Sequence, residues 1–145
     1  MTVSRRNFMD NRFPANRRVK MGVDFDRAYR GRKSAADTLV VVYAAANGLA
    51  HARLGLSVSR KVGNAVRRNR WKRLLREAFR LSQGELPAGM DFIIIPRADA
   101  EPELKSLSKS LVKLARLAAR KVTTAENEKR RREEEEKRRK GDEEI

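Results

Sequence analysis

The chain has 145 residues and a formal net charge of +16, because 35 lysines and arginines stand against 19 acidic residues. This length accommodates one domain with a modest core and excludes a two-domain enzyme, and the charge predicts a polyanionic partner. The absence of cysteine and the single histidine, His51, exclude disulfides and metal sites built from cysteine or histidine. The longest apolar run, residues 39–46, is too short to span a bilayer and no signal peptide is apparent, so we expect a soluble, cytoplasmic protein.

The pattern of charge divides the chain into three predicted parts. Residues 1–17 are a basic arm in which two phenylalanines interrupt the charges, and they predict either an arm that meets RNA or a flexible terminus whose rings pack into the core. Residues 18–124 are the expected domain. Residues 125–145 alternate acidic and basic blocks with almost nothing apolar, which predicts a helical extension or a disordered tail, with an interaction tail as the alternative.

The first predicted element of the domain is a short helix over residues 24–30. Phe25 and Tyr29 are four residues apart, so both rings lie on one face of this helix. Gly31 directly after it is a typical helix end.

Three strands follow, predicted over residues 39–44, 53–59 and 92–95, and all three are rich in β-branched or other apolar residues. An Asn-Gly turn at residues 47–48 lies in the connection between the first two strands, which is too long for a two-residue hairpin. We therefore expect these two strands to form an antiparallel pair with an irregular loop. His51 lies in that loop without a carboxylate or cysteine companion, and we interpret it as an ordinary surface residue rather than a catalytic base.

The most informative element is a helix predicted from Asn64, a favourable N-cap, to Gln83. At 100° per residue its apolar and basic side chains fall on opposite arcs. The apolar arc holds Trp71, Leu74, Leu75, Ala78 and Phe79, and the basic arc holds Arg70, Lys72, Arg73, Arg76 and Arg80. Between residues 60 and 80 there are nine basic residues and one acid, so like charges repel at three- and four-residue spacing. An ordinary solvated face mixes signs, and we interpret this one as the binding site of an anionic partner.

The last predicted helix begins near Pro102, a residue suited to a first helical turn. Its apolar residues recur every three or four positions: Leu104, Leu107, Leu111, Leu114, Ala118 and Val122. We expect this stripe to cover one face of the sheet. A coiled-coil dimer is the alternative, and it is less favoured because the stripe is shorter than three heptads.

The sequence contains no recognisable catalytic site. A metal-dependent nuclease needs several converging carboxylates, and acid–base catalysis needs at least two titratable groups close together. The acidic residues before the tail are few and scattered, and no glycine-rich phosphate loop, nucleophile elbow or metal-ligand spacing is present. The residues alone therefore predict a protein that binds RNA or DNA through a cationic helix and nearby aromatic rings, without a catalytic side chain of its own.

Residues 57–79, SVSRKVGNAVRRNRWKRLLREAF, resemble the signature of the bacterial ribonuclease P protein subunit. That signature is a strand, a basic turn, Gly-Asn-Ala-Val and then Arg-Asn-Arg-x-Lys-Arg, and the resemblance extends over residues 13 to about 122. It implies an α+β fold, a two-layer α/β sandwich with a small mixed sheet. It also implies that the basic helix crosses between the second and third strands by a left-handed connection, against the usual right-handed rule.

The resemblance implies a division of labour within a ribonucleoprotein. The catalytic RNA of the family, with bound Mg²⁺, hydrolyses the phosphodiester at the 5′ end of precursor tRNA, and the protein binds that RNA and the 5′ leader of the substrate. The implied partners are therefore this catalytic RNA and precursor tRNA, with no membrane and no small-molecule substrate. The Mg²⁺ is expected mainly on the RNA. A ribosomal-type structural RNA-binding protein is the alternative, because small basic α/β domains serve there too.

Carried over by position, the resemblance also implies two sets of binding residues and no catalytic or metal-binding residue. The catalytic RNA would be bound by Arg60, Lys61, Asn64, Arg68, Asn69, Arg70, Lys72, Arg73 and Arg76. The leader would be bound by Phe25, Tyr29, Tyr43, Ser57 and Val58. Stacking on aromatic rings suits single-stranded RNA of varied sequence. For Phe25 and Tyr29 the alternative is a plain core position.

Overall fold

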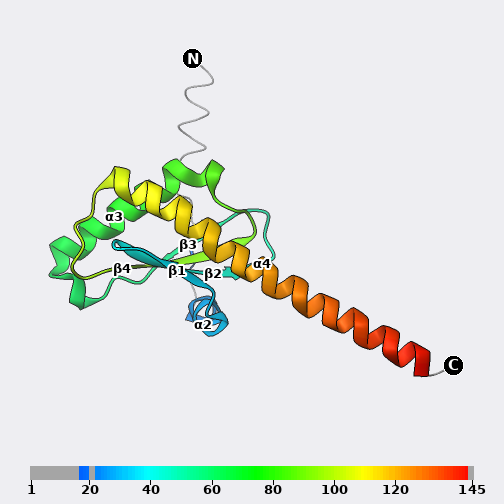
Figure 1. Cartoon of the computed structure of the whole chain (residues 1–145). Coiled ribbons are helices and arrows are strands. Elements are labelled where there is room, and N and C mark those ends of the chain that lie inside the picture. Colours follow the sequence, from blue (N-terminus) through cyan, green and yellow to red (C-terminus); the bar gives the residue numbers. More distant parts are fainter. Residues whose placement is uncertain (1–16, 20–21, 144–145) are drawn as a thin grey trace, which may run out of the picture.

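The computed structural model describes residues 17–19 and 22–143, so the basic arm predicted over residues 1–17 lies almost entirely outside the described residues. Helices and strands alternate irregularly along this part of the chain (Figure 1). In chain order they are α2 (Gly22–Gly31), β1 (Ser34–Ala36), β2 (Val40–Ala46), β3 (Arg53–Leu56), α3 (Ala65–Ser82), β4 (Met90–Pro96) and α4 (Leu104–Glu143), with short 3₁₀ turns η2 (Arg60–Val62) and η3 (Gln83–Glu85) on either side of α3.

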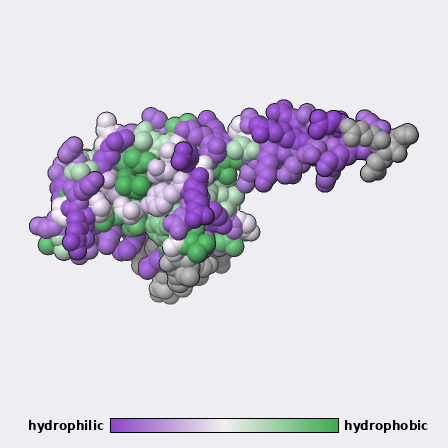
Figure 2. Space-filling model, turned by 90° about the horizontal axis from the view of Figure 1, so that it is seen from below, coloured by the Kyte–Doolittle hydropathy of each residue, from purple (hydrophilic) through white to green (hydrophobic). Residues whose placement is uncertain are grey.

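Helix α4 is 40 residues long and continues well past the body of the protein (Figure 1). It therefore includes residues 125–143, for which the sequence predicts either a helical extension or a disordered tail. In the structure these residues are helical. Figure 2 shows this distal part as a continuously hydrophilic rod that projects from the rest of the molecule. Among the described residues, no helix combines the length and the apolar character that a membrane crossing requires.

The four strands form one mixed sheet in the order β1-β2-β4-β3. Strand β2 pairs antiparallel with both β1 and β4, whereas β3 pairs parallel with β4. The predicted antiparallel pairing of β2 with β3 is therefore wrong. The reason is that β4, which is buried at six of its seven positions, occupies the centre of the sheet, and the four-residue β3 lies at an edge. Strand β1, only three residues long, was not predicted.

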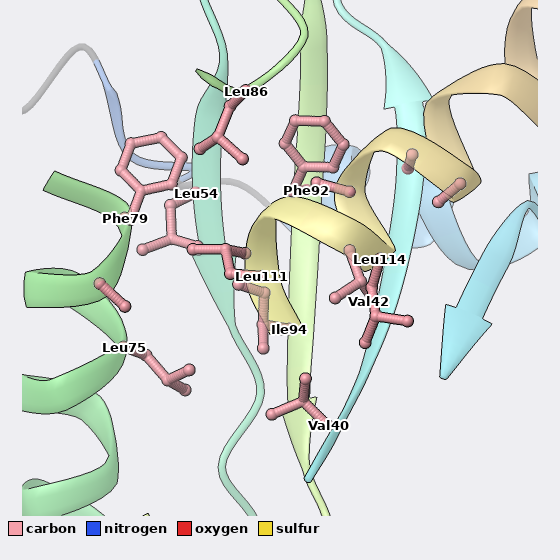
Figure 3. Close-up of a cluster of buried hydrophobic side chains, with 14 of the residues drawn as sticks. Val40, Val42, Leu54, Leu75, Phe79, Leu86, Phe92, Ile94, Leu111 and Leu114 are labelled. Atoms are coloured by element: carbon pink, nitrogen blue, oxygen red, sulfur yellow. The ribbon is translucent and has the colours of Figure 1, made fainter. Parts of the chain in front are cut away.

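The connection from β3 through α3 to β4 is left-handed, as the resemblance implies. Figure 3 views the sheet from the side of α4, with β3 to the left of β4 and with α3 beyond β3. Strand β4 runs downward in this view, from Phe92 to Ile94, and β3 is parallel to it. A right-handed crossover over this face would place β4 on the other side of β3.

The large core lies between this face of the sheet and the two helices α3 and α4 (Figure 3). Its buried side chains include Val40, Val42, Leu54, Phe92 and Ile94 from the sheet, Trp71, Leu75 and Phe79 from α3, and Leu107, Leu111 and Leu114 from α4. The amphipathic phase predicted for both long helices is thus confirmed, except that Leu74 of α3 and Leu104 of α4 are only partly buried at the margin of the core. The apolar stripe of α4 packs on the sheet rather than forming a coiled coil.

Helix α2 covers the opposite face of the sheet with a smaller core. Ala28 of α2 is buried against Val19, Ala45 and Ile93, and the aromatic residues of α2 and β2 pack around this cluster. Gly55 of β3 allows the close packing here. A Cβ atom at this position would lie 2.6 Å from the Ile93 side chain and 2.9 Å from the Phe25 ring, so a larger residue would push the ring away.

Candidate nucleic-acid interface

The start of α3 is fixed by the Gly-Asn pair that precedes it. The Asn64 side chain accepts a hydrogen bond from the Arg67 backbone N–H at 3.0 Å and thereby caps the helix. Gly63 has a φ of 144°, which an L side chain rarely adopts, and a Cβ atom there would lie 2.6 Å from the Arg67 side chain. Asn64, one of the predicted RNA-binding residues, therefore has a structural role that accounts for its presence.

Arg67, in the first turn of α3, is held in place by the protein itself. Its Nε donates to the Val62 carbonyl at 2.7 Å, its Nη2 to the Ala100 carbonyl at 2.8 Å, and its Nη1 pairs with Glu101 at 3.0 Å. The side chain thereby ties η2, α3 and the segment before α4 together. Reasoning from the sequence missed this role, because every partner is outside the helix and two of them are backbone groups.

The remaining cations of η2 and α3 behave differently. Within the part of the chain that the structure describes, no carboxylate lies within ion-pair distance of the guanidinium and ammonium groups of Arg60, Lys61, Arg68, Arg70, Lys72, Arg73 and Arg76. Arg80, by contrast, pairs with Glu77, and this hydrogen bond raises the pKa of Arg80 above its ordinary value. The predicted catalytic-RNA residues are exposed, except that Arg68 and Lys72 are half-buried on the flank of the helix, as is typical of long basic side chains. The first part of α3 therefore presents a surface of uncompensated positive charge.

The aromatic residues predicted to bind the leader lie together on the face of the sheet that α2 covers. Phe25, Tyr29 and Tyr43 are half-buried and pack against the same small core. The rings of Tyr29 and Tyr43 meet edge to face, with centroids 5.1 Å apart and planes at 82°. The three rings are thus neither fully exposed nor fully buried, and each keeps part of its surface accessible.

The other two predicted leader residues, Ser57 and Val58, lie on opposite faces of the sheet. The Ser57 backbone N–H donates to the Ile94 carbonyl at 3.0 Å, which continues the pairing of β3 by one residue, and the Ser57 side chain is half-buried. Because side chains alternate along an extended strand, Ser57 shares the face of Gly55 and the α2 aromatic rings. Val58 packs against the large core on the α3 and α4 side, so the structure does not bring it to these rings.

Two apolar residues that the sequence did not single out extend this face. Val41 and Ile95 are cross-strand partners, are both half-buried, and lie two positions along from Tyr43 and Ile93 on the same side of the sheet. Figure 2 views the molecule from the side of α2 and shows hydrophobic surface gathered on this face among hydrophilic side chains. Both strands are nearly continuous apolar runs in the sequence, which does not show which of their residues share a face with the rings, and the pairing of Val41 with Ile95 depends on the strand order.

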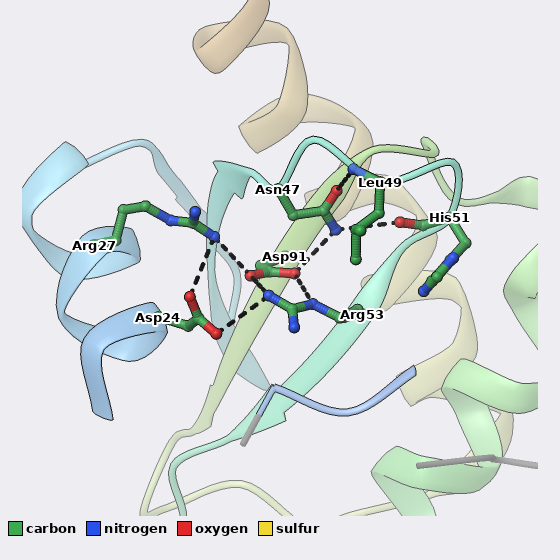
Figure 4. Close-up of polar contacts among 7 residues, drawn as sticks. All are labelled: Asp24, Arg27, Asn47, Leu49, His51, Arg53 and Asp91. Atoms are coloured by element: carbon green, nitrogen blue, oxygen red, sulfur yellow. Dashed lines mark hydrogen bonds and ion pairs between the residues drawn. The ribbon is translucent and has the colours of Figure 1, made fainter. Parts of the chain in front are cut away.

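Helix α2 is anchored to the sheet by a buried carboxylate (Figure 4). Asp91 of β4 is fully buried and accepts two hydrogen bonds from Arg53, at 2.7 and 2.6 Å, one from Arg27 at 2.9 Å and one from Asn47 at 3.0 Å. Asp24 of α2 accepts from Arg53 at 3.3 Å and completes the network. The hydrogen bonds to Asp91 raise the pKa of Arg53 above its ordinary value. Arg27 and Asp24 thus fix the helix that carries Phe25 and Tyr29.

Comparison with known proteins shows to which family the chain belongs. A sequence profile of the family Ribonuclease P matches residues 13–119. The ribonuclease P protein component of Pelotomaculum thermopropionicum is 42% identical over 101 residues, which cover 69% of this chain and 90% of that protein. The chain belongs to the ribonuclease P protein family. Its function is that of the protein subunit of ribonuclease P, a ribonucleoprotein endoribonuclease of tRNA processing.

Solved structures of the ribonuclease P protein family show the same fold. The Staphylococcus aureus ribonuclease P protein superposes with a TM-score of 0.62 at 38% identity, covering 70% of this chain and 94% of that one. The Thermotoga maritima protein gives a TM-score of 0.61 at 34% identity, over 66% of this chain and 92% of that one. The α+β fold with its small mixed sheet is thereby confirmed. The distal part of α4 lies beyond the residues that the family profile matches.

Proposed function

We propose that this ribonuclease P protein binds the catalytic RNA through η2 and the first half of α3. The observation that carries the proposal is the contrast among the arginines of α3. Arg67 and Arg80 have protein partners, whereas Arg70, Arg73 and their basic neighbours have no carboxylate partner within the described residues. Like charges this close destabilise an isolated helix, and RNA phosphates relieve the repulsion.

The second part of the proposal concerns the 5′ leader of precursor tRNA, which binds across the face beside α2. Three half-buried rings, those of Phe25, Tyr29 and Tyr43, border an apolar strand surface formed by Val41 and Ile95. Partly exposed rings can stack with any base, so such a surface accepts leaders of varied sequence. The exposed Arg60 and Lys61 of η2, the turn that follows β3, supply positive charge for the leader backbone as it passes toward α3.

The proposal leaves the chemical step to the RNA subunit. Mg²⁺ is held mainly by that RNA, because the surface proposed to face it is cationic and repels metal ions. Within the residues that the structure describes, no three His, Cys, Asp or Glu side chains are grouped so that they could hold a metal ion. The protein contributes binding and orientation, and we place this activity in the cytoplasm, where its RNA partners are made.

The decisive experiment is reconstitution with a bacterial ribonuclease P RNA. Adding the full chain should restore cleavage of precursor tRNA at low Mg²⁺ concentration, where the RNA alone is inactive. The protein without the RNA should release no leader at any Mg²⁺ concentration. Binding to ribosomal RNA without any effect on cleavage would contradict the proposal and favour a ribosomal-type structural role.

A further inference from the structure

The outer face of α4 carries a second row of positive charge. Residues 104–124 contain six basic residues and no acid. At 100° per residue, five of the six fall within an arc of about 80°, opposite the buried face of the helix. These five are Lys105, Lys109, Lys113, Arg116 and Arg120, and all are exposed.

The same helix shows what a solvated charged face looks like when no partner is required. From residue 125 onward every basic block is followed or preceded by an acidic one, and Glu136 forms an i,i+4 ion pair with Lys140 at 3.3 Å. Such pairs stabilise an exposed helix. In residues 104–124 the cations repeat at three- and four-residue spacing with no acid among them, and this arrangement opposes helix formation. The change of pattern within one helix therefore calls for an explanation specific to the first half.

Few of these cations are engaged within the protein. Arg116 donates its Nε to the Glu85 carbonyl at 3.1 Å, and Lys113 lies near enough to Asp37 to affect it electrostatically. For Lys109 and Arg120 the described residues provide neither an ion pair nor a side-chain hydrogen bond. Both line an open hollow of about 530 Å³ between α4 and the end of α3. Lys113 and Arg116 also line it, with the apolar side chains of Val112 and Leu117 and a single acidic residue, Glu85.

We propose that this hollow and the basic row of α4 form a second contact for the phosphodiester backbone of the catalytic RNA. The inference rests on the proposed function, since it extends the same partner over a further surface. None of the α3 residues proposed above lines the hollow, so the two contacts are separate. The catalytic RNA is the occupant because α4 lies on the same side of the sheet as α3, whereas the proposed leader surface lies on the α2 side.

The test compares two double variants that remove the same charge from the same helix. Lys109→Gln with Arg120→Gln neutralises the proposed contact, and Lys137→Gln with Arg131→Gln is the matched control in the sign-mixed part. Binding of the full chain to catalytic RNA is measured as a function of salt concentration. Because two cations no longer meet phosphates, the slope of log K against log salt should fall by roughly 1.4–1.8 in the first variant and remain unchanged in the control. Thermal melts must show both variants folded.

Further arms of the experiment separate the possible failures. Equal slopes for the two double variants would overturn the inference. If the double variant Arg70→Gln with Arg73→Gln still lowers the slope, the proposed function stands and only the second contact on α4 is rejected. If that double variant also leaves the slope unchanged, the second contact and the proposed function both fail. A loss confined to precursor tRNA binding by the assembled complex, with the slope for catalytic RNA unchanged, would overturn the assignment of this surface to the catalytic RNA.

Discussion

Tyr29 of α2 and Tyr43 of β2 meet edge to face across the boundary between a helix and a sheet, with ring centroids 5.1 Å apart. This contact, together with the Asp91 network, determines how the α2 aromatic rings are presented. An RNA base that stacks here meets rings whose positions are already fixed, so little conformational entropy is lost on binding.

Tyr29→Ala should weaken binding of precursor tRNA to the holoenzyme by one to two orders of magnitude, because stacking on one base contributes about 1–3 kcal/mol. Binding of mature tRNA, which lacks a leader, should change little. Tyr29→Phe retains the ring and should bind both RNAs normally. Equal losses for the two RNAs by a folded Tyr29→Ala protein would exclude this ring from the leader surface.

Arg70→Ala and Arg73→Ala should each reduce the salt dependence of catalytic RNA binding by about 0.7–0.9 in the slope of log K against log salt. Arg80→Ala is the control on the same helix, since Arg80 pairs with Glu77 and is not part of the proposed contact. Salt titrations of the three variants provide the measurement. If Arg80→Ala changed the slope as much as the other two, the proposed surface would be wrong.

Phe79→Ala should destabilise the protein by about 3–5 kcal/mol, since the ring is completely buried in the large core. Leu74→Ala should cost less, because this side chain is only partly buried, and Arg76→Ala should change stability by less than about 0.5 kcal/mol. Denaturant unfolding monitored by circular dichroism measures all three. The reverse order would show that the phase of α3 is wrong.

Asp91→Ala should cost roughly 3 kcal/mol, because it leaves Arg53 and Arg27 without the buried carboxylate that pairs with them. Asp26→Ala removes an exposed acid from α2 and should have an effect below about 0.5 kcal/mol. Since Asp91 anchors α2, the first variant should also bind precursor tRNA less tightly under conditions in which it is folded. Normal leader binding by the Asp91→Ala protein would show that the network does not position the rings.

The pH dependence of stability should include a contribution from Asp37. Burial raises the pKa of this carboxyl, but hydrogen bonds from the Ser110 side chain and the backbone N–H groups of Val40 and Leu39 outweigh it, so the folded-state pKa lies below the ordinary value of 3.8. The stabilisation is therefore fully present above pH 3.8 and is lost as pH falls through the lower, folded-state pKa. The stability difference between the wild-type protein and Asp37→Asn should be constant from about pH 7 to pH 5 and should shrink as the pH falls below the ordinary pKa of 3.8. A difference that grew with acidification would contradict this sign.

The sequence predicts well what depends on neighbouring residues. The N-cap at Asn64, the buried arc of α3 and the stripe of α4 follow from local periodicity, and the structure confirms them. The strand order does not follow in this way, because β4 comes after α3 in the chain yet inserts between β2 and β3, through a crossover of the less common hand. Neither the Asp91 network nor the pairing of Val41 with Ile95 could be found without that order.

The roles of single residues were predictable only where their partners were close in sequence. Asn64 and Arg68 belong to the same motif, yet the first caps the helix and the second is a cation without a carboxylate partner among the described residues. Val58 follows Ser57 directly, but strand alternation directs it to the opposite face of the sheet. The predicted binding residues as a set stay a prediction until RNA contacts are measured.

The length of α4 beyond its last buried turn has a practical consequence. From Val122 to Glu143 the helix rises by about 30 Å at roughly 1.5 Å per residue. A fluorophore attached near residue 143 therefore moves with α4 rather than on a flexible tether. Energy transfer from that position to labelled ends of the RNA would report the direction in which the protein is seated in the complex, as well as its distance from each end.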